Sequence, residues 1–238
     1  MVKFSVIIPT LNEEQNIKEC LESLLEQDTD ESYEVIVSDS NSEDNTKLIA
    51  KKYAHKVINC SKGISVGRNS GAKVSEGEIL IFIDADSVAS PRLLSSYSEV
   101  FENDKIIAAT GPIFPKENIK SVEGKFLEIG TKLYTESWMK FLIKIGKPTF
   151  IGSNCAFRKD KFFEVGGFKE NLKTFEDGDL SIRLTGRGDF AFHNEAKVFT
   201  SIRRLKKWGY FKFIKFHTTN SIKYIFFNKP HEDYEEVR

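Results

Sequence analysis

The chain has little of what marks several classes of protein. Its 238 residues contain three widely spaced cysteines, Cys20, Cys60 and Cys155, which make neither a disulfide framework nor a zinc site and favour a reducing compartment. Lys and Arg together number 35, as do Asp and Glu, so no net charge attracts nucleic acid. No apolar run approaches the ~20 residues that a transmembrane helix needs, and the first residues lack the apolar length and cleavage site of a signal peptide. We therefore expect a cytoplasmic protein with no nucleic-acid partner.

The chain also lacks a glycine-rich loop after its first apolar run, where a Rossmann dehydrogenase or a nucleotidyltransferase would have one. No Gly-x-Gly-x-x-Gly follows the first apolar run, which excludes a Rossmann dehydrogenase. The chain has no internal repeat and no low-complexity tract. Its length suits one large domain, or one α/β domain with an appended half.

The first hundred residues alternate short β-branched runs with segments of helical spacing. This order predicts βαβ units and a mostly parallel sheet, an α/β fold. In the second helix we expect Leu48 and Ile49 to face inward. The predicted strands are 4–8, 33–37, 55–59, 79–83 and 106–110, with helices around 17–25, after Ser42 or Asp44, over 66–74 and after Pro91.

After Gly111 the regular alternation of strands and helices ends, because Pro112 and Pro115 interrupt regular secondary structure. A long mixed segment, 121–145, predicts a helix rich in aromatic residues and lysines. The remaining expectations are a strand or ordered loop over 150–157, a helix over 159–165 ended by Gly166 and Gly167, a helix over 177–185, a strand over 198–201 and a helical tail over 205–227.

Two carboxylates stand at the end of the apolar run 79–83. Asp84 and Asp86 alternate with Ala85, so in an extended backbone both side chains leave the same face. Open α/β sheets place ligand sites at the carboxyl ends of their strands, and Mg²⁺ is held by one or two carboxylates together with substrate phosphates. The pair therefore predicts a metal site, with a solvated loop as the alternative.

Five polar segments fall where the pattern predicts loops at strand ends, and in this order the set resembles the family-2 glycosyltransferases. The resemblance runs from about residue 4 to about residue 204, and it implies the GT-A fold in a single compact domain. It assigns residues 1–110 to nucleotide-sugar binding, 111–204 to acceptor binding and catalysis, and 205–238 to a basic, aromatic helical tail. The segments are Pro9-Thr10-Leu11-Asn12-Glu13, Ser38-Asp39-Ser40-Asn41-Ser42, Gly67-Arg68-Asn69, Asp84-Ala85-Asp86 and Glu176-Asp177-Gly178-Asp179.

On the donor side, the resemblance implies a nucleoside wall, a base contact and a metal ligand. Asp39 would accept from the imide N–H of the base, unless it is a helix-cap or turn acid. Arg68 would lie near the base and phosphates, unless it is a surface arginine. Asp84 would lie near the ribose, and Asp86 would ligate Mn²⁺ or Mg²⁺ on the diphosphate. The wall itself would consist of Pro9, Thr10, Asn12 and Glu13, where Glu13 is otherwise explained as a first-turn acid.

On the acceptor side, the resemblance implies that Asp177 is the general base for the acceptor hydroxyl. The alternative is a helix N-terminus rich in acids, a description that Glu176, Asp177 and Asp179 all satisfy. Arg203 and Arg204 resemble a basic pair near the diphosphate, where they would offset charge on the leaving group, with a surface basic patch as the alternative. The other acceptor-side residues are Gly152, Ser153, Asn154 and Glu176.

The function expected from this resemblance is transfer of a single sugar from a nucleotide-diphosphate sugar to a hydroxyl, with inversion and with a metal. Processive members carry Gln-x-x-Arg-Trp, but here Arg204-Leu205-Lys206-Lys207-Trp208 lacks the Gln and Arg. The Asp39 carboxylate could accept from an N–H of uracil or of guanine. A UDP-sugar is therefore favoured only by its frequency in the family. A nucleotidyltransferase is one alternative, although the loop at residues 9–13 is neither glycine-rich nor basic. A decayed nucleotide-sugar-binding module is the other.

The tail interleaves basic and aromatic residues. Between Leu205 and Lys229 six lysines alternate with eight aromatic side chains. Such a helix can lie in a membrane interface, which would make the protein peripheral at the cytoplasmic membrane face and its acceptor a lipid-linked sugar or polyprenyl phosphate. The alternative is a helix that packs on the sheet with its lysines in water and a soluble sugar as acceptor.

Overall fold

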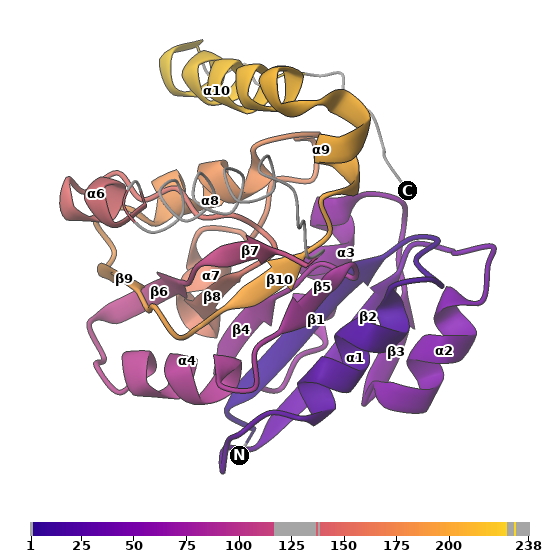
Figure 1. The fold of residues 1–238 in the computed structure, drawn as a ribbon. Helices are drawn as coiled ribbons and strands as arrows, with labels where there is room; N and C mark the ends of the chain where they lie inside the picture. The colour runs from indigo at the N-terminus through magenta and orange to yellow at the C-terminus, as the bar shows by residue number, and fades with distance from the viewer. Residues whose placement is uncertain (1, 117–136, 138, 228–230, 232–238) are drawn as a thin grey trace.

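The computed structural model describes residues 2–116, 137, 139–227 and 231 (Figure 1). Its described part centres on one seven-stranded sheet in the order β3-β2-β1-β4-β8-β6-β9. Neighbouring strands are parallel except β8, which runs antiparallel to both β4 and β6. The strands are β3 (Lys56–Asn59), β2 (Tyr33–Asp39), β1 (Phe4–Thr10), β4 (Ile79–Phe82), β8 (Cys155–Arg158), β6 (Ile106–Thr110) and β9 (Asp189–Phe192).

A small second sheet joins distant parts of the chain next to the carboxyl end of β4. It contains β5 (Ser87–Ala89), β10 (Val198–Thr200) and β7 (Ile113–Pro115), with β10 in the centre. Its antiparallel register places Thr200 opposite Ser87. Residues near position 200 therefore meet the loop that carries Asp84 and Asp86.

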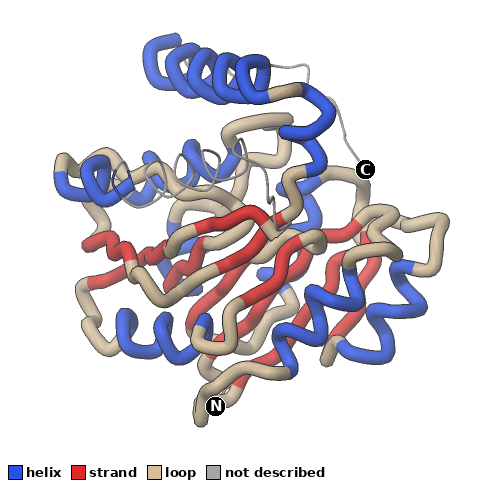
Figure 2. The backbone as a smooth tube through the Cα atoms, viewed as in Figure 1, coloured by secondary structure: helices blue, strands red, loops and turns tan. Residues whose placement is uncertain are grey.

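Helices cover both faces of the large sheet (Figure 2). Alternate side chains of β1 divide between two cores, because Val6 and Ile8 pack with α1 and α4 whereas Ile7 packs with α3, α7 and α8. The second core is aromatic, and Phe82 lies 5.0 Å from Phe168 between ring centroids. The helices are α1 (Ile17–Leu25), α2 (Thr46–Tyr53), α3 (Ile64–Lys73), α4 (Leu93–Phe101), α6 (Met139–Lys144), α7 (Lys159–Glu164), α8 (Glu176–Leu184), α9 (Arg203–Trp208) and α10 (Tyr210–Phe227).

The last helix, α10, lies beyond α8 from the sheet (Figure 1). Its Tyr224 ring packs 5.0 Å from Phe175, and Asn220 accepts a hydrogen bond from the Thr174 hydroxyl at 3.3 Å. Across the described ranges, no helix combines the length and the apolar character needed to cross a membrane.

The elements expected in the first 110 residues are confirmed, but one inward face is wrong. Leu48 is 59% exposed, because α2 buries Thr46 and Ala50, which lie on the opposite side of the helix. Ile49 packs against the core as expected. The predicted helix 121–145 falls mostly outside the described residues, which contain its last part as α6.

In the second half, Gly166 (φ +81°) and Gly167 (φ +67°) adopt the left-handed backbone that ends α7, as expected. Neither the antiparallel insertion of β8 nor the small second sheet was predicted. The three cysteines are free thiols.

Candidate active site

Polar side chains gather at the carboxyl ends of β1, β2 and β4. Asp39, at the end of β2, is fully buried and accepts hydrogen bonds from Thr10 Oγ1 at 3.2 Å, Ser42 Oγ at 2.6 Å and the Ser42 backbone N–H at 3.0 Å. Asn12 connects the same two loops, because its Oδ1 accepts from the Glu43 N–H at 2.8 Å. The first two strand-to-helix loops therefore form one wall, and Asp39 makes the local turn contacts named as its alternative role.

Arg68, on α3, holds two carboxylates from opposite sides of the site. Its Nη2 donates to Asp84 Oδ1 at 2.9 Å, and its Nη1 donates to Glu176 Oε1 at 2.8 Å. The residue is 1% exposed, so the alternative of a surface arginine is wrong. Gly152 makes room for it, since a Cβ at that position would lie 2.3 Å from Nη2.

Asp84 and Asp86 do not continue the strand. β4 ends at Phe82 and Asp86 lies in a turn, so the extended backbone assumed for the pair is wrong. Asp84 turns to Arg68, whereas Asp86 Oδ2 lies 3.2 Å from Arg203 Nη2 and its Oδ1 accepts from Thr200 Oγ1 at 3.4 Å. Burial, reinforced by the charge of Asp84, raises the pKa of Asp86 to about 6.

Arg203 is the first residue of α9, and it pairs with the carboxylates of Glu13 and Asp86. Its guanidinium binds both oxygens of Glu13, with Nη1–Oε2 at 3.0 Å and Nη2–Oε1 at 2.5 Å. Such a two-point contact fixes the arginine plane as well as its charge. The guanidinium carbon of Arg204 lies 5.9 Å from the centroid of the Trp208 ring. The contacts of Arg203 with Glu13 and Asp86 place that member of the basic pair in the acidic group.

Asp177 lies in the first turn of α8, and backbone amides hold both of its carboxylate oxygens. The Gly152 N–H donates to Oδ2 and the Gly178 N–H donates to Oδ1, each at 2.8 Å. Burial raises the pKa of Asp177, against the opposing charge of Arg68. Burial and the neighbouring Asp177 also raise the pKa of Glu176. This pair is therefore easier to protonate than ordinary carboxylates.

Asp179 has a different environment from the other two acids of its segment. It is 1% exposed and pairs with Lys169 at 2.8 Å, with Arg183 at 2.6 Å and with the Tyr224 hydroxyl. Despite its burial, these donors keep the pKa of Asp179 below its usual value. Asp179 anchors α8 to its surroundings and to α10.

The acceptor-side segment is largely internal. Asn154 is fully buried, accepts from the Tyr97 hydroxyl at 2.6 Å and donates to the Ala196 carbonyl at 2.8 Å. Ser153 is also buried. Sequence reasoning missed Tyr97 and Thr200, because each meets the site only through a contact between segments remote in sequence.

The charges of the site favour a cation. Four carboxylates (Glu13, Asp84, Asp86 and Glu176) pair with two guanidinium groups (Arg68 and Arg203), and a fifth, Asp177, is held by backbone amides, which leaves an excess of three acids. Among the described residues, no group of three or more His, Cys, Asp or Glu side chains is arranged to hold a metal ion alone. A hard cation held by Asp86 and by the oxygens of a phosphorylated ligand fits this donor set.

Comparison with known proteins identifies the class. Residues 5–166 match the model of Glycosyl transferase family 2. A Staphylococcus aureus protein, poly(ribitol-phosphate) beta-N-acetylglucosaminyltransferase TarS, is 39% identical over 74% of this chain and 31% of its own length. The uncharacterized glycosyltransferase YfnE of Bacillus subtilis is 28% identical over 79% of this chain and 61% of its own length. The chain thus spans less than two thirds of either relative.

Solved structures agree on the fold. The crystal structure of TarS residues 1–349 with UDP-GlcNAc superposes with a TM-score of 0.67 at 24% identity, covering 84% of this chain and 58% of that one. The mannosyltransferase PcManGT of Pyrobaculum calidifontis, in complex with GDP-Man and Mn²⁺, gives 0.67 at 20% identity over 84% and 57% of the two chains. The architecture is GT-A, as expected. The chain belongs to glycosyltransferase family 2.

The raised pKa of Glu176 predicts how stability depends on pH. The folded protein holds a proton that the unfolded chain releases near the ordinary value of 4.5, so its contribution to stability is complete below that value and is lost as pH rises through the folded pKa. We expect the melting temperature to fall between about pH 5 and about pH 8, and to fall less in Glu176→Gln, which keeps an acceptor for Arg68.

The matched control for this prediction is Glu102→Gln, at the exposed end of α4. Thermal unfolding of both variants and the wild type over the same pH range measures the difference. If the melting temperature falls with pH as steeply in both variants as in the wild type, Glu176 is not the group that holds the proton.

Proposed function

We propose that the chain transfers a single sugar from a nucleotide-diphosphate sugar to an acceptor hydroxyl, with inversion and with Mn²⁺ or Mg²⁺. The observation that carries this proposal is the ion cluster around Arg68, which joins Asp84 at the end of β4 to Glu176 at the start of α8. A donor held at the first and an acceptor held at the second would meet within one hydrogen-bonded cluster. We assign donor binding to residues 1–110 and acceptor binding with catalysis to residues 111–204.

The donor would lie along the wall formed by Pro9, Thr10, Asn12 and Asp39, with its ribose toward Asp84. A carboxylate at Asp39 can accept from a base N–H if one of its present donors gives way. The TarS complex with UDP-GlcNAc supports a UDP-sugar, whereas the PcManGT complex shows that a similar fold takes GDP-Man. We favour UDP on the sequence similarity to TarS.

Asp177 is the proposed general base. The acceptor oxygen forms a bond to the anomeric carbon while the carbon–oxygen bond to the diphosphate breaks, and the hydroxyl proton passes to the Asp177 carboxylate. Two backbone amides orient that carboxylate, and its raised pKa favours proton uptake. Attack from the face opposite the leaving group inverts the anomeric centre. The nucleoside diphosphate leaves with the electron pair.

The leaving diphosphate needs positive charge. Arg203 is the described cation nearest to Asp86, and its distance of 3.2 Å lets it reach a ligand held there. The divalent ion, when bound, supplies further charge against the developing negative charge of the diphosphate. The excess of acids around this position supports metal dependence, because an unaccompanied diphosphate would be repelled.

Non-processive transfer is proposed on the missing Gln-x-x-Arg-Trp motif. Family membership sets the nucleotidyltransferase alternative aside. A decayed binding module would not need Asp177, whose carboxylate is instead fixed by two amides. Two acceptor classes fit the proposal, a soluble sugar and a lipid-linked sugar or polyprenyl phosphate, and they differ in whether the protein must reach a membrane.

Asp86→Ala should abolish metal-dependent donor binding without unfolding the chain, because Asp86 lies in a turn outside both cores. Isothermal titration with UDP, with and without Mn²⁺, measures the affinity, and thermal unfolding checks the fold. Asp104→Ala, an exposed acid in another turn, is the matched control. Unchanged Mn²⁺-dependent affinity in the Asp86 variant would refute the metal assignment.

Asp177→Asn should keep donor binding and lower turnover by ~10²–10⁴-fold, the usual contribution of a general base. The amide has nearly the same size but cannot take the proton. Donor hydrolysis in the presence of Mn²⁺ gives the rate, and UDP titration gives the binding. Asp160→Asn, an exposed first-turn acid of α7, is the control and should keep the wild-type rate. A near wild-type rate for Asp177→Asn would place the base elsewhere, with Glu176 as the next candidate.

A further inference from the structure

The positive charge of the chain is concentrated in its last two described helices. Residues 203–227, which span α9 and α10, contain seven Lys and Arg residues and no Asp or Glu. Because the whole chain has a net charge of zero, the remaining residues carry a net charge of −7. A negatively charged surface would therefore attract this segment and repel the rest of the molecule, which gives the chain a preferred orientation.

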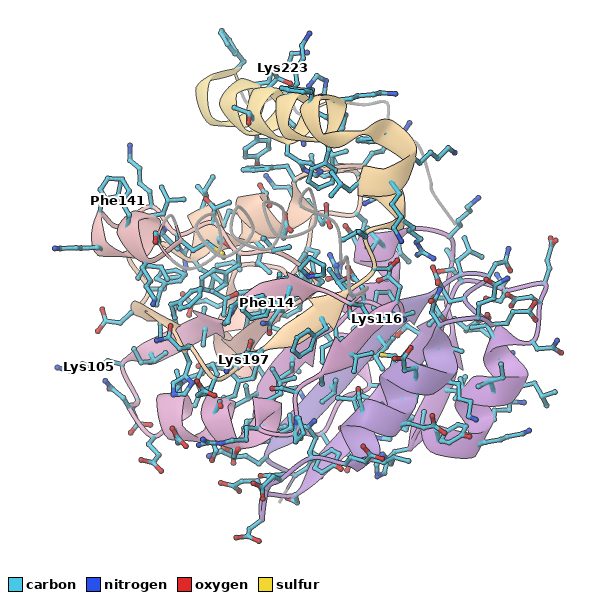
Figure 3. All side chains as sticks on the ribbon, viewed as in Figure 1. Lys105, Phe114, Lys116, Phe141, Lys197 and Lys223 are labelled. Atoms are coloured by element: carbon cyan, nitrogen blue, oxygen red, sulfur yellow. The ribbon has the colours of Figure 1, made fainter. Side chains whose placement is uncertain are left out.

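One side of α10 packs on the body and the other faces out. The packed side contains Asn220 and Tyr224, which contact Thr174, Phe175 and Asp179. The outer side presents Lys212, Lys215 and Lys223 in exposed positions, and Lys223 points away from the body (Figure 3). Phe211 and Phe227, at the two ends of the helix, are 88% and 71% exposed. Large apolar side chains among lysines are typical of helices that lie on lipid.

The packed side connects this surface to the proposed acceptor side. Tyr224 donates to Asp179, two residues after Asp177 on α8, and its ring contacts Phe175, the residue before α8. Through Tyr224, α10 thus contacts the helix that carries the proposed base. A surface in contact with the outer side of α10 would therefore be separated by this one helix from α8, which carries the proposed base.

We propose that the outer face of α10 docks on an anionic phospholipid membrane. Resting on the proposed function, this places the acceptor hydroxyl on a molecule presented at that membrane, which favours a lipid-linked acceptor over a soluble sugar. The charge pattern is the argument for lipid over a protein partner, because the outer side of α10 presents Lys212, Lys215 and Lys223 and residues 203–227 contain no acid, which matches a uniformly negative surface. The exposed Phe211 and Phe227 add apolar contact that a polyanion such as DNA does not need.

Co-sedimentation of the full chain with vesicles tests this proposal. We expect binding to phosphatidylcholine vesicles that contain phosphatidylglycerol, no binding to pure phosphatidylcholine, and weaker binding as salt is added. Replacing Lys212, Lys215 and Lys223 together by Glu should weaken binding at least about 100-fold, since each cation near an anionic surface contributes roughly a fivefold factor.

The control is a second triple variant with the same change of net charge. Lys51, Lys52 and Lys73 are exposed on α2 and α3, and their replacement by Glu should leave vesicle binding at the wild-type level. Both triple variants should keep the wild-type melting temperature and the wild-type rate of donor hydrolysis in solution, which shows that they fold.

Three results would overturn the membrane proposal: no binding to anionic vesicles at low salt, equal losses in the two triple variants, or equally tight lysine-dependent binding to double-stranded DNA. The two proposals fail separately. If the chain hydrolyses the donor but does not bind vesicles, only the membrane proposal is refuted. If it binds vesicles but does not hydrolyse the donor, only the proposed activity is refuted.

Discussion

The guanidinium of Arg68 is buried, and it exists there as a cation because two carboxylates meet it from opposite sides of the molecule. Asp84 comes from the loop after β4, and Glu176 comes from α8, 108 residues away from Arg68 in sequence. Taking a charge out of water costs several kcal/mol, and loss of one partner from such a cluster typically costs about 3–5 kcal/mol. The arginine therefore makes the arrangement of the loop after β4 and of α8 mutually dependent. Gly152 belongs to the same constraint, because only a residue without Cβ leaves room for the guanidinium and also offers its N–H to Asp177.

The rest of the site follows from this central cluster. With Asp84 engaged by Arg68, Asp86 is the member of the pair that faces Thr200 and Arg203, so the two acids have separate partners. With α8 fixed at Glu176, the neighbouring Asp177 is presented on backbone amides, while Asp179 on the far side of the helix is neutralised by Lys169, Arg183 and Tyr224. One short acidic segment thus supplies an ion-pair partner, a candidate base and an anchor for α10. The second arginine, Arg203, joins the first loop of the chain to its last helices through Glu13.

Local patterns predicted the parallel half of the sheet well, because β1 to β4 and β6 are short apolar runs separated by helices that bury one face. The same reasoning failed for Leu48, because the face that α2 buries is set by Thr46 and Ala50, on the opposite side of the helix. It also missed the antiparallel insertion of β8 between β4 and β6, and the pairing of β5 with β10, since antiparallel insertion and long-range pairing leave no local period. The residues of the site were named from a family pattern, but Arg68 as a bridge and Thr200 as a neighbour of Asp86 depend on contacts across more than 100 residues. Charge partners of this kind are set by the fold and not by any spacing in the sequence.

The reaction that we propose is a single displacement across the Arg68 cluster, with the acceptor side opposite the leaving diphosphate. The anomeric configuration of the released sugar tests it most directly. Proton NMR during donor hydrolysis, recorded before the free sugar mutarotates, identifies the anomer first formed when water takes the place of the acceptor. We expect the anomer opposite to that of the donor sugar. First release of the anomer with the donor's own configuration would contradict it, because that outcome requires two displacements or attack from the face of the leaving group.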